Sequence, residues 1–193
     1  MTGSTMIDLG PQARIVARLA ERVTDEQLTG ATPCPEYAVR HLLGHVAGLS
    51  VAFRDAARKD LGASTDGSRS AGLPGLDPGW RRELPEALDA LARAWREPSA
   101  WGGMTRAGGI DLPGEVAAAV AADELVVHGW DLARATGQEY TPDPAALEAA
   151  YGFLRAAAQA DRGPFGPLVA VPESAPLLAR TVGLSGRDPG WKP

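Results

Sequence analysis

Hydrophobic residues recur every three or four positions over several long stretches of the chain, which is the spacing of one face of an α-helix. These stretches predict five helices, at about 8–23, 36–60, 81–97, 114–136 and from Pro144 to before Gly163. Asp8 is expected to cap the start of the first helix, and Gly137 to follow the end of the fourth. The pattern therefore predicts an all-α protein.

Three segments lack this periodicity. Residues 61–79 are rich in Gly, Ser and Pro and predict a long mobile loop. Residues 100–113 contain four glycines and only short apolar pieces, so a small irregular turn structure is expected there, near the mouth of any site. The tail, from Gly163 onward, is punctuated by prolines, and we expect it to wrap the helices as extended chain with one short helix.

Length and composition narrow the class of protein. A chain of 193 residues is expected to form a single domain, 1–193, with a real core. The formal charge of −5 and the absence of a Lys/Arg cluster argue against nucleic-acid binding, and no apolar run reaches the ~18 residues of a membrane span. The first ten residues lack the features of a signal peptide, and the single cysteine, Cys34, excludes an internal disulfide. These features together predict a soluble, cytoplasmic protein.

The candidate chemistry lies in the only three histidines, His41, His45 and His128, and in Glu124. Residues four apart on a helix stack on one face, which relates His41 to His45 and Glu124 to His128. Two imidazoles and a carboxylate between two helices would provide N and O donors for Zn²⁺ or a similar ion. Three protein ligands would leave an open coordination position, which is typical of catalytic metal sites.

Helix phase separates the two histidines of the second helix. A histidine beside an apolar stripe is more often an ordinary core residue than a ligand, so the angle matters. His45 lies roughly 85° from the centre of the stripe formed by Val46 and Phe53, and His41 lies about 40° further toward solvent. His45 is therefore the predicted ligand, and His41 is predicted to be a neighbour of the site or a surface residue.

Glu124 and His128 lie in a helix that is apolar almost throughout, and burying them without partners would be costly. Metal coordination would satisfy both, and so would an exposed helix stripe. Asp131 continues the same row one turn later. It could accept the second N–H of a ligand histidine, or it could be a solvated carboxylate paired with Arg134 or Arg155.

Cys34 raises a rival hypothesis, because it precedes a helix start by about two residues, where a thiolate is favoured. It could be a nucleophile activated by His41 or His45, or a fourth metal ligand. The simpler interpretation is a small buried side chain in a loop. The sequence contains no serine nucleophile elbow, phosphate loop or dinucleotide fingerprint.

At these residues the chain resembles a known family. The segments are TPCPEYAVRHLLGHVAGL (32–49), WGGMTRAGGIDLPG (101–114), DELVVHGWDLARATGQ (123–138) and RGPFGPLVAVPESAP (162–176). They resemble the DinB/YfiT-like superfamily. More narrowly, they resemble actinobacterial single-domain proteins grouped with the metal-binding N-terminal domain of mycothiol-dependent maleylpyruvate isomerase. The resemblance runs from the first helix to about residue 176.

The resemblance implies a DinB-like four-helix bundle with an extra helix, long loops and an extended C-terminal tail. It also implies one divalent metal, Zn first and Ni, Mn or Fe as alternatives, held at the positions of His45, Glu124 and His128. Members with known activity mostly use a low-molecular-weight thiol such as mycothiol. The isomerase carries a second domain after the bundle for which 193 residues leave no room, which counts against the maleylpyruvate reaction itself.

The leading hypothesis is a metal-dependent thiol S-transferase or isomerase that acts on a small electrophilic substrate with mycothiol or a similar thiol. Arg40, Trp130 and Arg134 are candidates for binding the thiol's polar end, and each also has a structural interpretation. The alternatives are a non-catalytic metal- or small-molecule-binding bundle and a metal-dependent hydrolase. All of them need the same three ligands. The sequence therefore leaves open the reaction, the native metal and the oligomeric state, a homodimer included.

Overall fold

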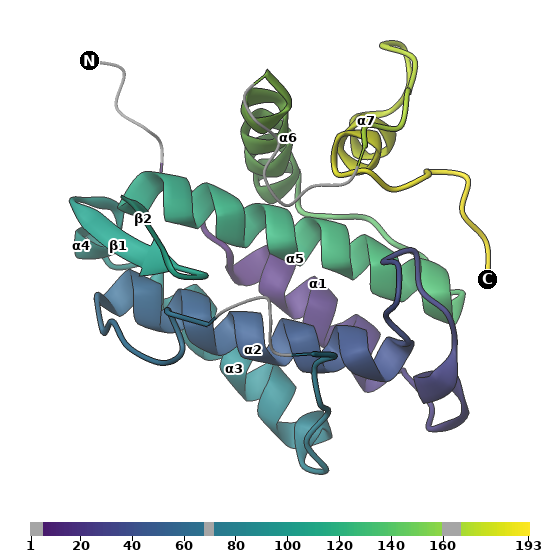
Figure 1. Ribbon diagram of the computed structural model, residues 1–193, viewed down its shortest axis with the longest axis horizontal. Helices are drawn as coiled ribbons and strands as arrows, with labels where there is room; N and C mark the ends of the chain where they lie inside the picture. Colours follow the sequence, from purple (N-terminus) through teal and green to yellow (C-terminus); the bar gives the residue numbers. More distant parts are fainter. Residues whose placement is uncertain (1–5, 68–71, 160–166) are drawn as a thin grey trace.

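The computed structural model describes residues 6–67, 72–159 and 167–193 (Figure 1). It is mostly helical, as predicted. Its elements are α1 (Gly10–Glu21), the 3-10 turn η1 (Glu26–Thr29), α2 (Val39–Arg58), α3 (Trp80–Ala94), α4 (Pro98–Trp101), β1 (Met104–Ala107), β2 (Ile110–Pro113), α5 (Gly114–Thr136), α6 (Pro144–Gln159) and α7 (Leu177–Leu184).

Four of the helices form a bundle: α2 packs against α3 and α5, and α1 packs against the same two helices. Helix α6 lies on the opposite side of α5, and α7 packs on α6 (Figure 1). Helix α5 is therefore covered on two sides, which explains why its sequence is apolar nearly all round rather than along one stripe. The four-helix bundle with an extra helix is confirmed.

The bundle core is built from the stripes that the periodicity predicted. Leu42, Leu43 and Val46 of α2 are almost fully buried, and α3 contributes Leu84 and Leu88 at the same depth. Burying each such side chain stabilises the fold by roughly 1.5–3 kcal/mol relative to its exposure to water. The position of α2 against α5 is therefore set by the core that they share.

Two helices begin later than predicted. Leu9 occupies the N-cap position of α1, and the Asp8 carboxylate instead accepts the backbone N–H of Gly10 at 2.9 Å. Helix α2 begins at Val39 rather than near residue 36, since Glu36 has a φ of 70° and cannot continue a right-handed helix. The turn before α2 therefore holds Cys34 outside the helix.

The prediction of an irregular turn structure over 100–113 is wrong. This segment ends the short helix α4 and then forms an antiparallel hairpin, β1–β2, with Met104 opposite Pro113 and Ala107 opposite Ile110. Gly108 and Gly109 form the two-residue turn with φ values of 59° and 78°. Such hairpin turns require positive φ at both central residues, which glycine adopts without strain.

The long loop and the tail follow their predictions in outline. Within 61–79, the described residues contain no helix or strand, and 68–71 lie outside the described part of the chain, so the predicted mobility stays a prediction. The tail contains one short helix, α7, followed by non-helical chain to residue 193. Among the described residues, no helix has both the length and the apolar character needed to cross a membrane.

Candidate metal centre

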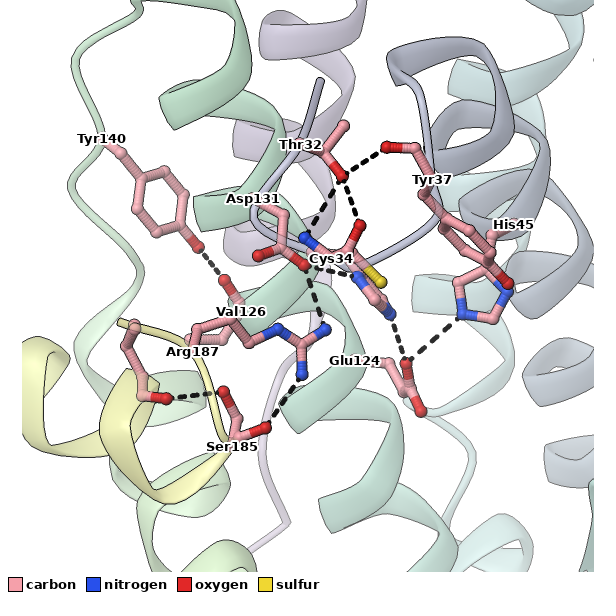
Figure 2. Close-up of polar contacts among 12 residues, drawn as sticks. Thr32, Cys34, Tyr37, His45, Glu124, Val126, Asp131, Tyr140, Ser185 and Arg187 are labelled. Carbon is pink, nitrogen blue, oxygen red and sulfur yellow. Dashed lines mark hydrogen bonds and ion pairs between the residues drawn. The ribbon is translucent and has the colours of Figure 1, made fainter. Parts of the chain in front are cut away.

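The three predicted ligands come together where α2 faces α5. The Glu124 Oε2 atom lies 3.0 Å from His128 Nε2 and 3.9 Å from His45 Nε2, and the candidate donor atoms all lie within 4.8 Å of one another (Figure 2). Bond lengths near 2 Å place the donors of a tetrahedral zinc about 3–3.5 Å apart. The Glu124–His128 separation already suits a single divalent ion, and the His45 ring would move closer to complete the set.

The His128 ring is oriented by a buried carboxylate. Its Nδ1 atom lies 2.9 Å from Asp131 Oδ2, and Asp131 is fully buried one turn further along α5. A carboxylate at this position favours the proton on Nδ1 and leaves Nε2 free to bind a cation. The cationic partner of Asp131 is neither Arg134 nor Arg155 but Arg187, whose Nη2 donates to Oδ2 at 3.1 Å.

In the absence of a cation, the Glu124 carboxylate and the His128 imidazole stabilise each other's charged forms. Burial by itself would raise the pKa of Glu124, but hydrogen bonds from His128 and His45 hold it well below its ordinary value. Burial would likewise lower the pKa of His128, but the bonds to Asp131 and Glu124 raise it to about 9. A bound divalent cation would take the place of the proton that His128 holds at neutral pH.

A second buried carboxylate, Asp123, precedes Glu124. Its burial and the neighbouring charge of Glu124 raise its pKa well above the ordinary value. Its Oδ1 atom has no hydrogen-bond partner among the described residues. A neutral acid tolerates such surroundings better than an anion does. The group of close candidate donors contains Glu124 and not Asp123.

Cys34 does not fit the nucleophile hypothesis. Burial raises the pKa of its thiol to about 11, despite the nearby Arg187, so the thiol is protonated at neutral pH. The described group of close metal-binding atoms contains His45, Glu124 and His128 and not Cys34. The cysteine backbone is held locally, with Thr32 Oγ1 donating to its carbonyl and accepting its N–H.

His41 lies apart from the group, in keeping with its phase on the helix. Its Nδ1 accepts the backbone N–H of Ala38 at 3.1 Å, which caps the first turn of α2. The Tyr37 ring contacts both histidines: its centroid lies 5.6 Å from that of His45 and 6.4 Å from that of His41. The spacing 37, 41, 45 could have identified Tyr37 as a neighbour of His45.

The three candidates for thiol binding have other surroundings. Trp130 is buried, with the Arg134 guanidinium 6.0 Å from its ring. Arg134 also donates to the Trp191 backbone carbonyl, which attaches the tail to α5. Arg40 is exposed. The described polar contacts of Arg134 are thus with the tail rather than with the three candidate ligands.

Comparison with known proteins places this chain in a family. Residues 9–133 match the model of the mycothiol maleylpyruvate isomerase N-terminal domain. Two uncharacterized proteins of Mycobacterium tuberculosis, from strains CDC 1551 and H37Rv, are each 32% identical over 132 residues, which are 66% of this chain. The chain spans 65% of the length of these relatives.

The crystal structures of the mycothiol-dependent maleylpyruvate isomerase and of a point mutant are similar at 18% and 17% identity, each with a TM-score of 0.47. Each match covers 74% of this chain and 65% of the isomerase chain. The family match carries the assignment, because it extends over most of the chain and includes His45, Glu124 and His128. The chain belongs to the mycothiol maleylpyruvate isomerase N-terminal domain family.

Proposed function

We propose that this protein binds one divalent metal ion at His45, Glu124 and His128 and uses it to activate a low-molecular-weight thiol. The observation that carries the proposal is the approach of two imidazole nitrogens and a carboxylate oxygen from two helices to within 4.8 Å of one another. Nitrogen and oxygen donors of this kind suit Zn²⁺, and Ni, Mn and Fe accept the same set.

Each residue has a definite part in this proposal. Glu124 would supply the one negative charge among the ligands, and its position between the two imidazoles lets both approach the same point. Asp131 holds the His128 ring so that Nε2 points toward Glu124. Three protein ligands leave room for an exogenous donor. A divalent ion held there would lower the pKa of a coordinating thiol and favour its nucleophilic thiolate.

The name of the family supports mycothiol as the thiol, since the matched domain is described by its relation to a mycothiol-dependent isomerase. The thiolate would attack an electrophilic carbon of a small substrate and form a carbon–sulfur bond. In S-transfer a leaving group would depart from that carbon with its bonding electrons. In isomerisation the addition would be reversed, and the thiolate would leave again. Cys34 would not compete as the nucleophile because its own pKa is raised to about 11. The chain would then supply the thiol-activating site, and the substrate would supply the electrophilic carbon.

The test uses Co²⁺ in place of Zn²⁺, because a thiolate bound to Co²⁺ produces a charge-transfer band. We expect mycothiol to produce this band in Cys34→Ser protein, in which no thiol of the chain can contribute. Glu124→Ala should lose the band together with the metal. Co²⁺-loaded protein that gives no spectral response to millimolar thiol would refute thiol activation and favour a non-catalytic or hydrolytic site.

A further inference from the structure

The buried carboxylate behind the candidate metal centre is shared between two elements far apart in the sequence. Asp131 Oδ2 accepts the Nδ1–H of His128 at 2.9 Å and the Nη2–H of Arg187 at 3.1 Å (Figure 2). Asp131 and Arg187 are 56 positions apart, and Arg187 lies beyond residues 9–133, the part that matches the family. The tail thus supplies a direct contact to the residue that orients a candidate ligand.

The backbone around Arg187 is fixed by the way α7 ends. The N–H of Arg187 donates to the Val182 carbonyl at 3.1 Å, and the N–H of Gly186 donates to the Gly183 carbonyl at the same distance. Gly186 has a φ of 85°. These two bonds around a left-handed glycine form a Schellman motif, which closes the helix and sets the direction of the following residue. Arg187 therefore leaves α7 in a defined direction.

The Arg187 side chain is held at the two terminal nitrogens of its guanidinium group. Nη1 donates to the Ser185 carbonyl at 3.1 Å while Nη2 donates to Asp131. The other oxygen of Asp131, Oδ1, has no hydrogen-bond partner among the described residues. The position of this carboxylate therefore depends on two contacts to one oxygen, and removing either would leave a buried anion poorly fixed.

We infer that Arg187 is a positioning residue for the metal centre: it fixes Asp131, which in turn holds the His128 ring with Nε2 directed toward Glu124. This inference rests on the proposed metal site. It assigns the tail a part in that site through the contact of Arg187 with Asp131. Coupling of this kind is reciprocal. If Arg187 strengthens metal binding by some factor, the metal strengthens docking of the tail by the same factor.

The test compares Zn²⁺ affinities by competition with a chelator. Loss of an outer contact to a metal-binding histidine weakens affinity by 10- to 100-fold in general, and we expect Arg187→Gln to cost about tenfold. Arg180→Gln is the matched control: Arg180 donates to the Tyr151 hydroxyl on α6, and its described side-chain contacts are with Tyr151 rather than with Asp131. We expect this control to change the affinity by less than about twofold.

Two further measurements distinguish positioning from general loosening of the tail. In Zn²⁺-loaded protein, the NMR resonance of the His128 Nδ1 proton should shift in Arg187→Gln and stay in place in Arg180→Gln. In an Asp131→Asn background, Arg187→Gln should change the affinity by less than about twofold, because the residue through which it acts is already altered. A full effect in that background, or equal effects of Arg180→Gln and Arg187→Gln, would overturn the inference.

The remaining outcomes separate this inference from the proposed function. Wild-type protein that binds Zn²⁺ with an affinity unchanged by Arg187→Gln would refute the role of Arg187 and leave the metal site standing. Wild-type protein that binds no divalent metal would refute both. Should Arg187→Gln fail to fold, hydrogen exchange in the wild type provides the test. Zn²⁺ should slow exchange of the amides of 177–191, and unchanged exchange would overturn the coupling.

Discussion

The two ring nitrogens of His128 have different partners, and this fixes which nitrogen can face a metal ion in the candidate centre. Nδ1 of His128 is occupied by Asp131, and Nε2 faces the Glu124 carboxylate. The ring therefore cannot exchange the roles of its two nitrogens without breaking a buried hydrogen bond. The His45 ring instead packs in T-shaped contacts against the rings of Tyr37 and His128. The two histidines are thus held by different means.

The first prediction separates ligands from neighbours. His45→Ala and Glu124→Ala should each weaken Zn²⁺ binding far more than His41→Ala, because only the first two supply atoms of the close group. His41→Ala should cost mainly the hydrogen bond to the Ala38 N–H at the start of α2, which is about 1 kcal/mol of stability. Isothermal titration at one pH measures the affinities. Loss of binding in His41→Ala alone would show that the wrong histidine has been assigned.

The second prediction concerns the metal-free protein and pH. The folded-state pKa of His128, about 9, lies above the ordinary 6.5, so the folded state holds the proton more tightly. The resulting stabilisation is complete below about pH 6.5 and is lost as pH rises through 9. Glu124, with its pKa lowered, is ionised in both folded and unfolded states across this window and adds no slope. The unfolding temperature in chelator should therefore fall from pH 6.5 to 9.

The control for this pH effect is His128→Asn, which removes the titrating ring. Asp123, whose pKa is raised, is present in both proteins, so its own contribution cancels in the comparison. The variant should show a flatter dependence of the unfolding temperature on pH over 6.5–9 than the wild type. Identical slopes for the two proteins would mean that the His128 proton does not stabilise the fold.

Among the elements, α2 shows what the spacing of hydrophobic residues can predict. Its apolar stripe predicted the buried face, and the phase of His45 relative to that stripe predicted that it, rather than His41, turns toward the neighbouring helix. Both results follow from the fixed rotation of about 100° per residue. The partner helix α5 was identified by its apolar content, and its Glu124 and His128 share one face for the same reason.

Other elements could not be predicted from local patterns. Each hairpin strand has four residues, which is too short for an alternation of apolar and polar residues to be recognised. Met104 and Ile110 are exposed although they are apolar, so the outer face of the hairpin does not look polar in the sequence. The contact of Arg187 with Asp131 depends on how α6 and α7 fold back over α5, and nothing near either residue in the sequence indicates it. The face of a helix on which a residue lies follows from nearby sequence, whereas the pairing of Arg187 with Asp131 depends on the fold of the whole chain.

The third prediction uses two glycines on α2 as a matched pair. A Cβ at Gly44 would lie 2.2 Å from the Gly75 carbonyl oxygen, so Gly44→Ala must displace the loop against this face of the helix. A Cβ at Gly48 would meet nothing within 4 Å. We expect Gly44→Ala to destabilise the fold by about 1–3 kcal/mol. Gly48→Ala should stabilise it by up to about 1 kcal/mol, because alanine favours the helix.

Urea unfolding of the two glycine variants measures both changes with one method. The midpoint should fall for Gly44→Ala and rise for Gly48→Ala, with unchanged slopes that indicate the same surface exposed on unfolding. Equal shifts in the same direction would show that the loop at residue 75 does not pack on α2 as described.

For the whole molecule, the important arrangement is that the candidate ligands belong to two helices that share the bundle core. His45 comes from α2, and Glu124 and His128 come from α5, which also carries α6 and the tail on its other side (Figure 1). A cation held by all three would connect α2 and α5, since residues 45 and 124 are more than 70 positions apart in the chain. Metal binding should therefore affect the stability of the entire bundle rather than one loop.

The last prediction follows from this arrangement. A ligand that binds only the folded state stabilises it by RT ln(1 + [L]/Kd), which is about 2.7 kcal/mol at 100 times the Kd. For a chain of this size, that should raise the unfolding temperature by about 5–10 °C in the presence of Zn²⁺. Differential scanning calorimetry should show this rise at pH 7.5 and its reversal by chelator. His45→Ala, which removes the proposed ligand on α2, should abolish most of it. A rise that is equally large in His45→Ala would place the bound metal elsewhere on the protein.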